Sequence, residues 1–336
     1  MLVVKPGVTD VQIQQLCHVA KNGCKWVGNP SHGGVPFFEV RATESDLEVV
    51  IKSGRGAVKY IEPDQPMYEV PELSADDAEA SLWGLERIGA YQRTSTGQGV
   101  SVFVLDTGVR ATHRDFGGRA IPTIDLSDGS VVECDGALTC AADTRGHGTH
   151  CAGSAGGATY GVAPGATVRS AKVHPASGWG HFGSTIAALN WIATSGIRPA
   201  VASISLQGSF QQAMTDAVDA ATRAGVSVVV AAGNAGSDAC TSTPSHVPSA
   251  ITVGSTDSRD SRSSFSNWGR CVNIWAPGSS ILSAGHDSDT SAKTMSGTSM
   301  SCPYVSGGAA LVLQENPKTP KPHPPFFDFK LSNVKI

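Results

Sequence analysis

Near-continuous apolar runs alternate with helical patterns from Trp83 onward, and this alternation restricts the possible fold more than any other feature. The runs predicted as strands are Val100–Leu105, Thr167–Val173, Val201–Leu206, Val226–Ala231 and Ala250–Val253. Strands that are apolar along their whole length are buried on both faces, as in a parallel sheet covered by helices. We expect two of these helices over Ser184–Thr194 and Gln211–Ala224. The pattern predicts an α/β domain of three layers, with a parallel sheet between two layers of helices.

The N-terminal region has a different pattern, in which strands and helices follow the order β-α-β-β-α-β. The strands predicted with bounds are Leu2–Lys5, Phe37–Arg41 and Val58–Ile61. One helix is predicted from Thr9-Asp10 to about Lys21, and another over Ser45–Lys52, after Thr43-Glu44. This order is typical of the ferredoxin-like motif, so residues 1–68 are predicted to form a small α+β domain. A proline-rich, acidic run comes next, and residues 69–80 are therefore predicted to be a linker.

Three short motifs hold an acid, a base and a nucleophile in the chain order Asp, His, Ser. Asp106 ends a predicted strand, His147 lies between two glycines, and Ser299 precedes an apolar helical run. Functional groups of parallel sheets gather beyond the carboxyl ends of the strands, and Asn234 also follows such an end. A serine becomes a nucleophile when a histidine takes its proton and a carboxylate orients that histidine. The three motifs together therefore indicate nucleophilic catalysis.

Each motif also has a simpler interpretation when it is taken alone. Ser299 could be an N-cap serine, and Gly233-Asn234 could be a plain turn. His147 and His150 could bind zinc, but the glutamate of a zinc-protease helix is absent from this motif. Asp106-Thr107-Gly108 matches the aspartic-protease signature. This signature occurs here in one copy and in a parallel-sheet context, and both facts argue against an aspartic protease.

The motifs and their order resemble those of the subtilase family of serine proteases, particularly its proteinase K-type branch. The matching runs are Val104–Gly108, Gly146–Gly153, Ala231–Asn234, Ser263–Gly269, Ala276–Gly278 and Ser296–Met300. The resemblance implies a subtilisin-like peptidase domain over residues 81–316, with Asp106, His147 and Ser299 as the catalytic triad. It implies that Asn234 donates to the oxyanion. Residues 1–68 resemble the inhibitor I9-type propeptide of the same family, with an autoprocessing site expected within residues 69–80.

The resemblance also implies that a peptide binds as an extra β-strand between two backbone segments. The residues expected to contact substrate are Gly178, Trp179, Gly180, Ser205, Leu206, Gln207, Ala231 and Gly233. Gln207 stands where family members usually have glycine, which predicts a narrower or more polar S1 rim. Trp179 either forms an apolar wall of the site or packs on its own loop. We expect broad endopeptidase specificity that favours apolar residues.

Eight cysteines suit an extracellular protein better than a metal site, because their spacings are not those of zinc ligands. Cys240 with Cys271, and Cys134 with Cys140, lie in loop-like contexts and are candidate disulfides, which favours an oxidising compartment. Cys151 and Cys302 fall inside the motifs and are expected to be buried free thiols. Met1–Pro6 lacks the charged and apolar regions of a signal peptide.

No cofactor is expected, although the family resemblance implies a structural calcium site at Pro248, Ala250 and Asn273. Asparagine replaces a carboxylate there, which weakens the site because calcium favours charged oxygen ligands. The formal net charge of −4 and the absence of a basic run argue against nucleic acid as a partner. The apolar runs are too short to cross a bilayer, so no membrane partner is expected. The family resemblance implies a monomer that acts on proteins or peptides.

The proline-rich run of residues 317–336 departs from the family, so the chain is expected to be truncated at both ends, without the C-terminal part of the peptidase domain. Two functions remain open from sequence. One is an active serine endopeptidase that is made as a zymogen and inhibited by its own propeptide. The other is an inert binding protein that has a subtilase scaffold and retains its propeptide.

Overall fold

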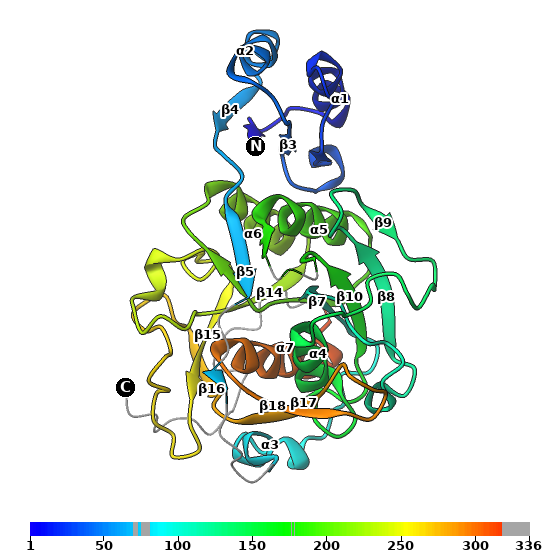
Figure 1. Ribbon diagram of the computed structural model, residues 1–336, viewed down its shortest axis with the longest axis vertical. Helices are drawn as coiled ribbons and strands as arrows, with labels where there is room; N and C mark the ends of the chain where they lie inside the picture. The colour runs from blue at the N-terminus through cyan, green and yellow to red at the C-terminus, as the bar shows by residue number, and fades with distance from the viewer. Residues whose placement is uncertain (70–72, 75–80, 176, 178, 318–336) are drawn as a thin grey trace.

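The computed structural model describes residues 1–69, 73–74, 81–175, 177 and 179–317 (Figure 1). A small N-terminal domain, drawn in dark blue, stands on one end of a large domain that contains the remaining helices and strands (Figure 1). The predicted proline-rich tail of residues 317–336 lies outside the described residues, apart from Pro317. No helix in the described ranges is both long and apolar enough to cross a membrane.

The N-terminal domain has the predicted β-α-β-β-α-β succession. Its elements are β1 (Leu2–Val4), α1 (Asp10–Val19), β2 (Trp26–Val27), β3 (Phe37–Glu39), α2 (Glu44–Ser53) and β4 (Val58–Ile61). The strands form an antiparallel sheet in the order β2-β3-β1-β4. Thr9 caps α1 in a capping box with Gln12, and Thr43 caps α2, so both helices begin where an N-cap residue predicts.

An eight-stranded sheet forms the centre of the large domain, in the order β16-β15-β14-β12-β7-β10-β8-β9. The bounds are β7 (Ser101–Asp106), β8 (Ala120–Asp125), β9 (Val132–Glu133), β10 (Thr167–Lys172), β12 (Ala200–Ile204), β14 (Val226–Ala231), β15 (Ile251–Thr256) and β16 (Ile274–Pro277). Its neighbouring strands are parallel except for the β8–β9 pair. The predicted α/β class is therefore confirmed.

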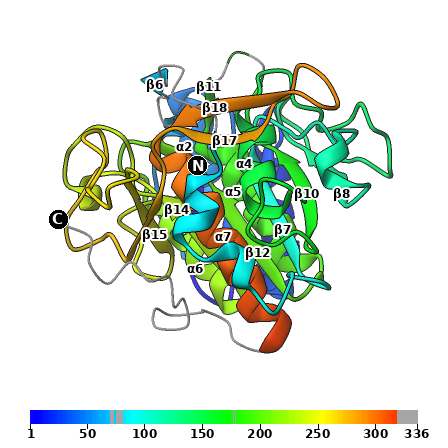
Figure 2. The same ribbon diagram turned by 90° about the horizontal axis from the view of Figure 1, so that it is seen from below.

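Helices cover both faces of this sheet and make the two outer layers. The helices are α4 (His147–Gly156), α5 (Phe182–Thr194), α6 (Gln212–Arg223) and α7 (Thr298–Glu315), and a short α3 (Trp83–Arg87) precedes β7. Phe103 and Leu105 of β7 pack with α5 and α6, whereas Val102 and Val104 pack with α4 and α7. Successive side chains of a strand point to opposite faces, so both faces of β7 must be apolar. Figure 2 shows α4 and α7 side by side on their face of the sheet.

The segment after β4 forms two short strands, the second of which lies within the predicted linker of residues 69–80. β5 (Pro66–Glu69) is the middle strand between β11 (Trp179–His181) and β13 (Leu206–Gly208), antiparallel to both. β6 (Leu73–Ser74) pairs with β18 (Ala292–Ser296), which also pairs with β17 (Ile281–Ala284). Both strands pair with segments that are distant in the sequence. The rest of residues 69–80 lies outside the described residues.

Two carboxylates of the segment between β4 and β5 cap helices of the large domain. Glu62 accepts hydrogen bonds from the backbone N–H groups of Gln212 (3.1 Å) and Ala213 (2.6 Å) at the start of α6. Asp64 accepts one from Gly183 (3.0 Å) at the start of α5. Negative groups are stabilised at helix N-termini, so these contacts hold the N-terminal domain against the large domain.

The described residues contain three disulfides: Cys17–Cys24, Cys134–Cys140 and Cys240–Cys271. The last two are the pairs expected from their loop contexts. Cys17–Cys24 joins the end of α1 to the loop before β2 and is not among the predicted pairs, although the two cysteines are close in sequence. Cys151 and Cys302 are buried free thiols, as predicted.

Candidate active site

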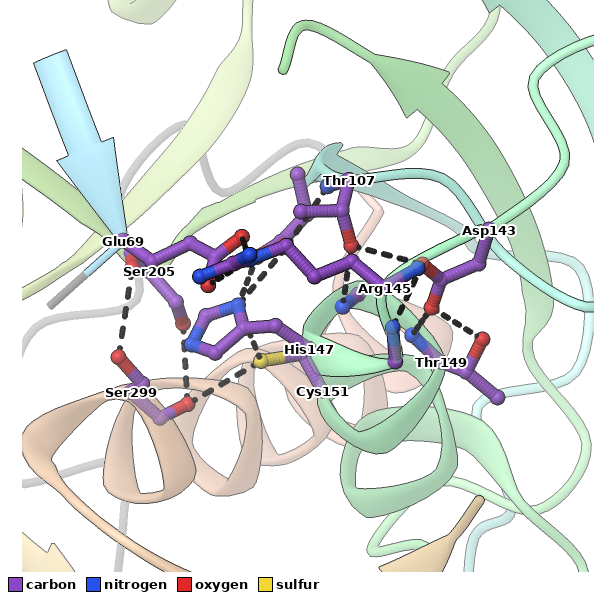
Figure 3. Close-up of polar contacts among 12 residues, drawn as sticks. Glu69, Thr107, Asp143, Arg145, His147, Thr149, Cys151, Ser205 and Ser299 are labelled. Atoms are coloured by element: carbon purple, nitrogen blue, oxygen red, sulfur yellow. Dashed lines mark hydrogen bonds and ion pairs between the residues drawn. The ribbon is translucent and has the colours of Figure 1, made fainter. Parts of the chain in front are cut away.

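The three residues of the predicted triad come from elements that meet beyond one edge of the sheet. Asp106 is the last residue of β7, His147 is the first residue of α4, and Ser299 is the second residue of α7. α4 packs against both β7 and α7. Figure 3 shows His147 and Ser299 projecting from neighbouring helices toward the same space.

Asp106 and His147 form a buried pair, and each side chain is only 1% exposed. The His147 Nδ1 atom lies 2.8 Å and 2.9 Å from the two carboxylate oxygens. A neutral imidazole that donates from Nδ1 has Nε2 as its proton acceptor. Burial by itself lowers the pKa of His147, but the Asp106 carboxylate outweighs it and holds the pKa well above the ordinary 6.5.

A close approach between α4 and the end of β7 explains the glycine that follows His147. A Cβ atom at Gly148 would lie 2.2 Å from the carbonyl oxygen of Gly108 and 3.1 Å from Asp106 Cβ. Any larger residue would push α4 away from β7, and the Asp106–His147 hydrogen bonds would lengthen.

A second carboxylate, that of Asp143, ties the two loops of this pair together (Figure 3). The Thr107 hydroxyl donates to Asp143 Oδ1 (2.9 Å) and accepts from the backbone N–H of Gly148 (3.0 Å). Asp143 also accepts from the N–H groups of Gly146 (2.8 Å) and Thr149 (2.9 Å). Burial would raise the pKa of Asp143, but hydrogen bonds, the first from Thr149, hold it below its usual value. Asp143 is not among the predicted site residues, although an acid just before a helix start is a visible signal.

The backbone around Ser299 is fixed by side chains from outside its helix. The Ser299 hydroxyl, which is buried, donates to the Ser205 carbonyl oxygen at 3.3 Å. The Ser299 carbonyl oxygen accepts from Ser205 Oγ (3.0 Å) and Cys151 Sγ (3.4 Å). Four residues along α7, Pro303 has no N–H to donate to this carbonyl. Ser205 and Cys151 therefore replace the missing helical hydrogen bond beside the candidate nucleophile.

Asn234 lies beside the start of α7, and its amide oxygen accepts two hydrogen bonds from that helix. Its Oδ1 accepts from the backbone N–H (2.9 Å) and the hydroxyl (2.8 Å) of Thr298. The Thr298 hydroxyl in turn accepts from the N–H of Gly233 at 3.1 Å. Because two donors hold the oxygen, the amide Nδ2 is fixed as the end that can donate elsewhere.

The predicted substrate-binding strands flank β5. Leu206, Gln207 and Gly208 of β13 pair with Glu69, Tyr68 and Met67 respectively. Trp179 and Gly180 of β11 pair with Tyr68 and Met67 on the other side. Gly178 lies outside the described residues.

Other predicted substrate residues lie in or near the strands β11, β13 and β14. Gln207 is buried, and its Oε1 atom packs over Gly233, where a Cβ atom would lie 2.3 Å from it. Ala231 is buried at the end of β14. Trp179 is 65% exposed, and its ring centroid lies 5.8 Å from that of Tyr68. The Trp179 ring therefore packs against Tyr68 of β5.

The three residues expected to bind calcium do not fit the ion. Asn273 Oδ1 accepts a hydrogen bond from the backbone N–H of Thr252 at 2.8 Å. Arg270 lines the same hollow as Pro248 and Asn273 and would bring a positive charge to it. Calcium prefers several charged oxygen ligands, and Asn273 supplies none.

The chain belongs to the subtilase family, because that family's model matches residues 97–326. It is 44% identical over 268 residues to alkaline serine exoprotease A of Vibrio alginolyticus, covering 77% of this chain and 48% of that protein. It is 45% identical over 270 residues to the extracellular serine proteinase of Thermus sp. (strain Rt41A), covering 77% and 62%. The chain therefore spans about half to less than two thirds of these relatives. A cold adapted subtilisin-like serine proteinase of known structure matches with a TM-score of 0.66 and 44% identity, over 72% of this chain and 88% of that one.

Proposed function

We propose that this chain is a serine endopeptidase that uses Asp106, His147 and Ser299. The observation that carries the proposal is the buried Asp106–His147 pair beside Ser299 at the start of α7. Membership of the subtilase family and relatives named as serine proteases support it.

In this proposal the Ser299 hydroxyl attacks the peptide carbonyl carbon while His147 Nε2 takes its proton. Asp106 stabilises the resulting imidazolium, and Asn234 Nδ2 donates to the oxyanion. The C–N bond then breaks, the amine leaves with the proton from His147, and an acyl group remains on Ser299. Water, deprotonated by His147, attacks this ester and releases the second product with Ser299 restored.

The N-terminal domain is proposed to be a propeptide that inhibits the enzyme. β5 lies between β11 and β13, where the family is expected to bind a substrate strand. Further along the chain, β6 pairs with β18. Cleavage is expected between Glu69 and Leu73, since the described strands flank that segment. The helix caps made by Glu62 and Asp64 support an N-terminal domain that stays bound after cleavage. A relative named as an extracellular proteinase and the three disulfides support secretion.

Covalent labelling tests the proposal directly. A sulfonyl fluoride should modify Ser299 of the purified full chain after its N-terminal segment has been cut, and peptide mass spectrometry should find the adduct on that residue. Unfolded casein should be digested by the same preparation, and labelling should stop the digestion. Soluble chain that neither reacts with the reagent nor digests casein would instead be the inert scaffold that retains its N-terminal domain.

Replacing Asn234 with Ala should lower kcat by about 10²–10³ and change KM little, the loss seen when such a donor is removed from a subtilisin. The amide donates to charge that exists only in the transition state, so ground-state binding is not affected. Steady-state kinetics on one chromogenic peptide measure both constants. A variant that keeps kcat within threefold of the parent would exclude Asn234 as the oxyanion donor.

A further inference from the structure

The last residue of β5 makes an ion pair with a residue that precedes His147. The carboxylate oxygens of Glu69 lie 2.6 Å and 2.8 Å from Nε of Arg145 (Figure 3). The Glu69 side chain is 11% exposed and that of Arg145 is 44% exposed. The Glu69 carboxylate is therefore mostly buried, while the Arg145 side chain that pairs with it is partly exposed to solvent.

The register of β5 relates this pair to the bond that would be cut. Glu69 lies opposite Leu206 in an antiparallel pairing, so the next position of a peptide in the same register lies opposite Ser205. Ser205 is the residue whose carbonyl accepts from the Ser299 hydroxyl. A substrate in this register therefore presents its acyl residue to Ser299 and places the preceding residue, P2, where Glu69 lies.

The backbone that carries Arg145 is held in place independently of the ion pair. The N–H of Arg145 donates to Asp143 Oδ1 at 2.9 Å, and Asp143 is itself fixed by the start of α4. Burial raises the pKa of the Glu69 carboxyl, and the Asp106 carboxylate raises it as well. His147 and Arg145 lower this pKa, but the net shift is upward. The Arg145 guanidinium is thus carried to the P2 position by a backbone that is held in place.

We propose that Arg145 makes this enzyme prefer an acidic residue at P2 of its substrates. The proposal rests on the proposed peptidase function and adds to it the class of peptide selected. A guanidinium pairs with a carboxylate by charge-assisted hydrogen bonds, which a neutral amide of the same shape forms more weakly. Glu69 would then be the residue by which the chain presents its own segment as a substrate.

Matched fluorogenic peptides that differ only at P2, with Glu, Gln or Lys, test this selectivity on the processed full chain. We expect kcat/KM to be about three- to tenfold higher for Glu than for Gln, as suits a partly exposed pair. Arg145→Ala should bring the ratio to about one, and Arg145→Glu should make the Lys peptide the best of the three. Each variant is judged on a ratio, so a general change in its activity cancels.

Arg110 offers a matched control, since it pairs with Asp289 (2.7 Å) rather than with β5. Arg110→Ala should retain the Glu/Gln ratio of the parent enzyme. A parent ratio near one, or a preference that persists in Arg145→Ala, overturns the selectivity while leaving the peptidase function intact. Failure of the parent enzyme to cut any of the peptides refutes the peptidase function, and the selectivity falls with it.

Discussion

Ser299→Ala should yield a single uncut chain of 34.6 kDa, whereas the parent chain should separate into an N-terminal fragment and a larger one. Peptidase activity should fall by about 10⁶, the loss that follows removal of the nucleophile in a subtilisin. The reason is that alanine has no hydroxyl to form the acyl-enzyme, while Asp106, His147 and the strands β11 and β13 are unchanged. Denaturing gels, intact mass and a peptide assay measure these outcomes.

Ser301→Ala is the matched control for this variant. Ser301 lies two residues further along α7, is equally buried, and donates to the carbonyl of Ala276 at 3.0 Å. Its replacement should leave processing as in the parent chain. Release of the N-terminal fragment from purified Ser299→Ala protein would show that another nucleophile, or another protease, makes the cut.

The central sheet can be predicted from sequence because its strands are apolar on both faces. The residues of β14, for example, are all buried, so the run Val226–Ala231 is sufficient evidence by itself. β5 carries no such signal, because Met67 is its one fully buried side chain, its first residue is Pro66, and Pro63 lies shortly before it. Its conformation is set by hydrogen bonds to β11 and β13, which lie more than a hundred residues away. Local patterns cannot reveal a strand of that kind.

In the candidate site, too, some residues can be predicted from the sequence and others cannot. Asp106, His147 and Ser299 lie in short motifs whose glycines and order can be recognised in one dimension. Their supporting contacts join residues that are distant in sequence, such as Ser205 with the Ser299 carbonyl, 94 residues apart. A serine in an apolar strand gives no sign of that role. Asn273 is a different case, since the absence of a carboxylate at that position of the calcium prediction is visible in the sequence itself.

Asp106→Asn should lower kcat by about 10⁴ at neutral pH. An asparagine that presents its Nδ2 to the imidazole forces the proton onto Nε2, and that nitrogen can then no longer accept from Ser299. The variant should also lose the electrostatic stabilisation of the imidazolium. Kinetics at substrate saturation, with circular dichroism to verify folding, measure the first effect.

The pH profile of kcat/KM separates these two effects, because it reports the pKa values of the free enzyme. His147 must be neutral to accept a proton, so parent activity should rise with pH through a pKa above 6.5, the direction in which Asp106 shifts it. Without that carboxylate, the largest influence that raises the pKa of His147 is lost, while burial, which lowers this pKa, remains. The residual activity of Asp106→Asn should therefore reach its plateau at lower pH than the parent activity. An unchanged midpoint would mean that the limb reports a group other than His147, and the assignment of the base would have to be withdrawn.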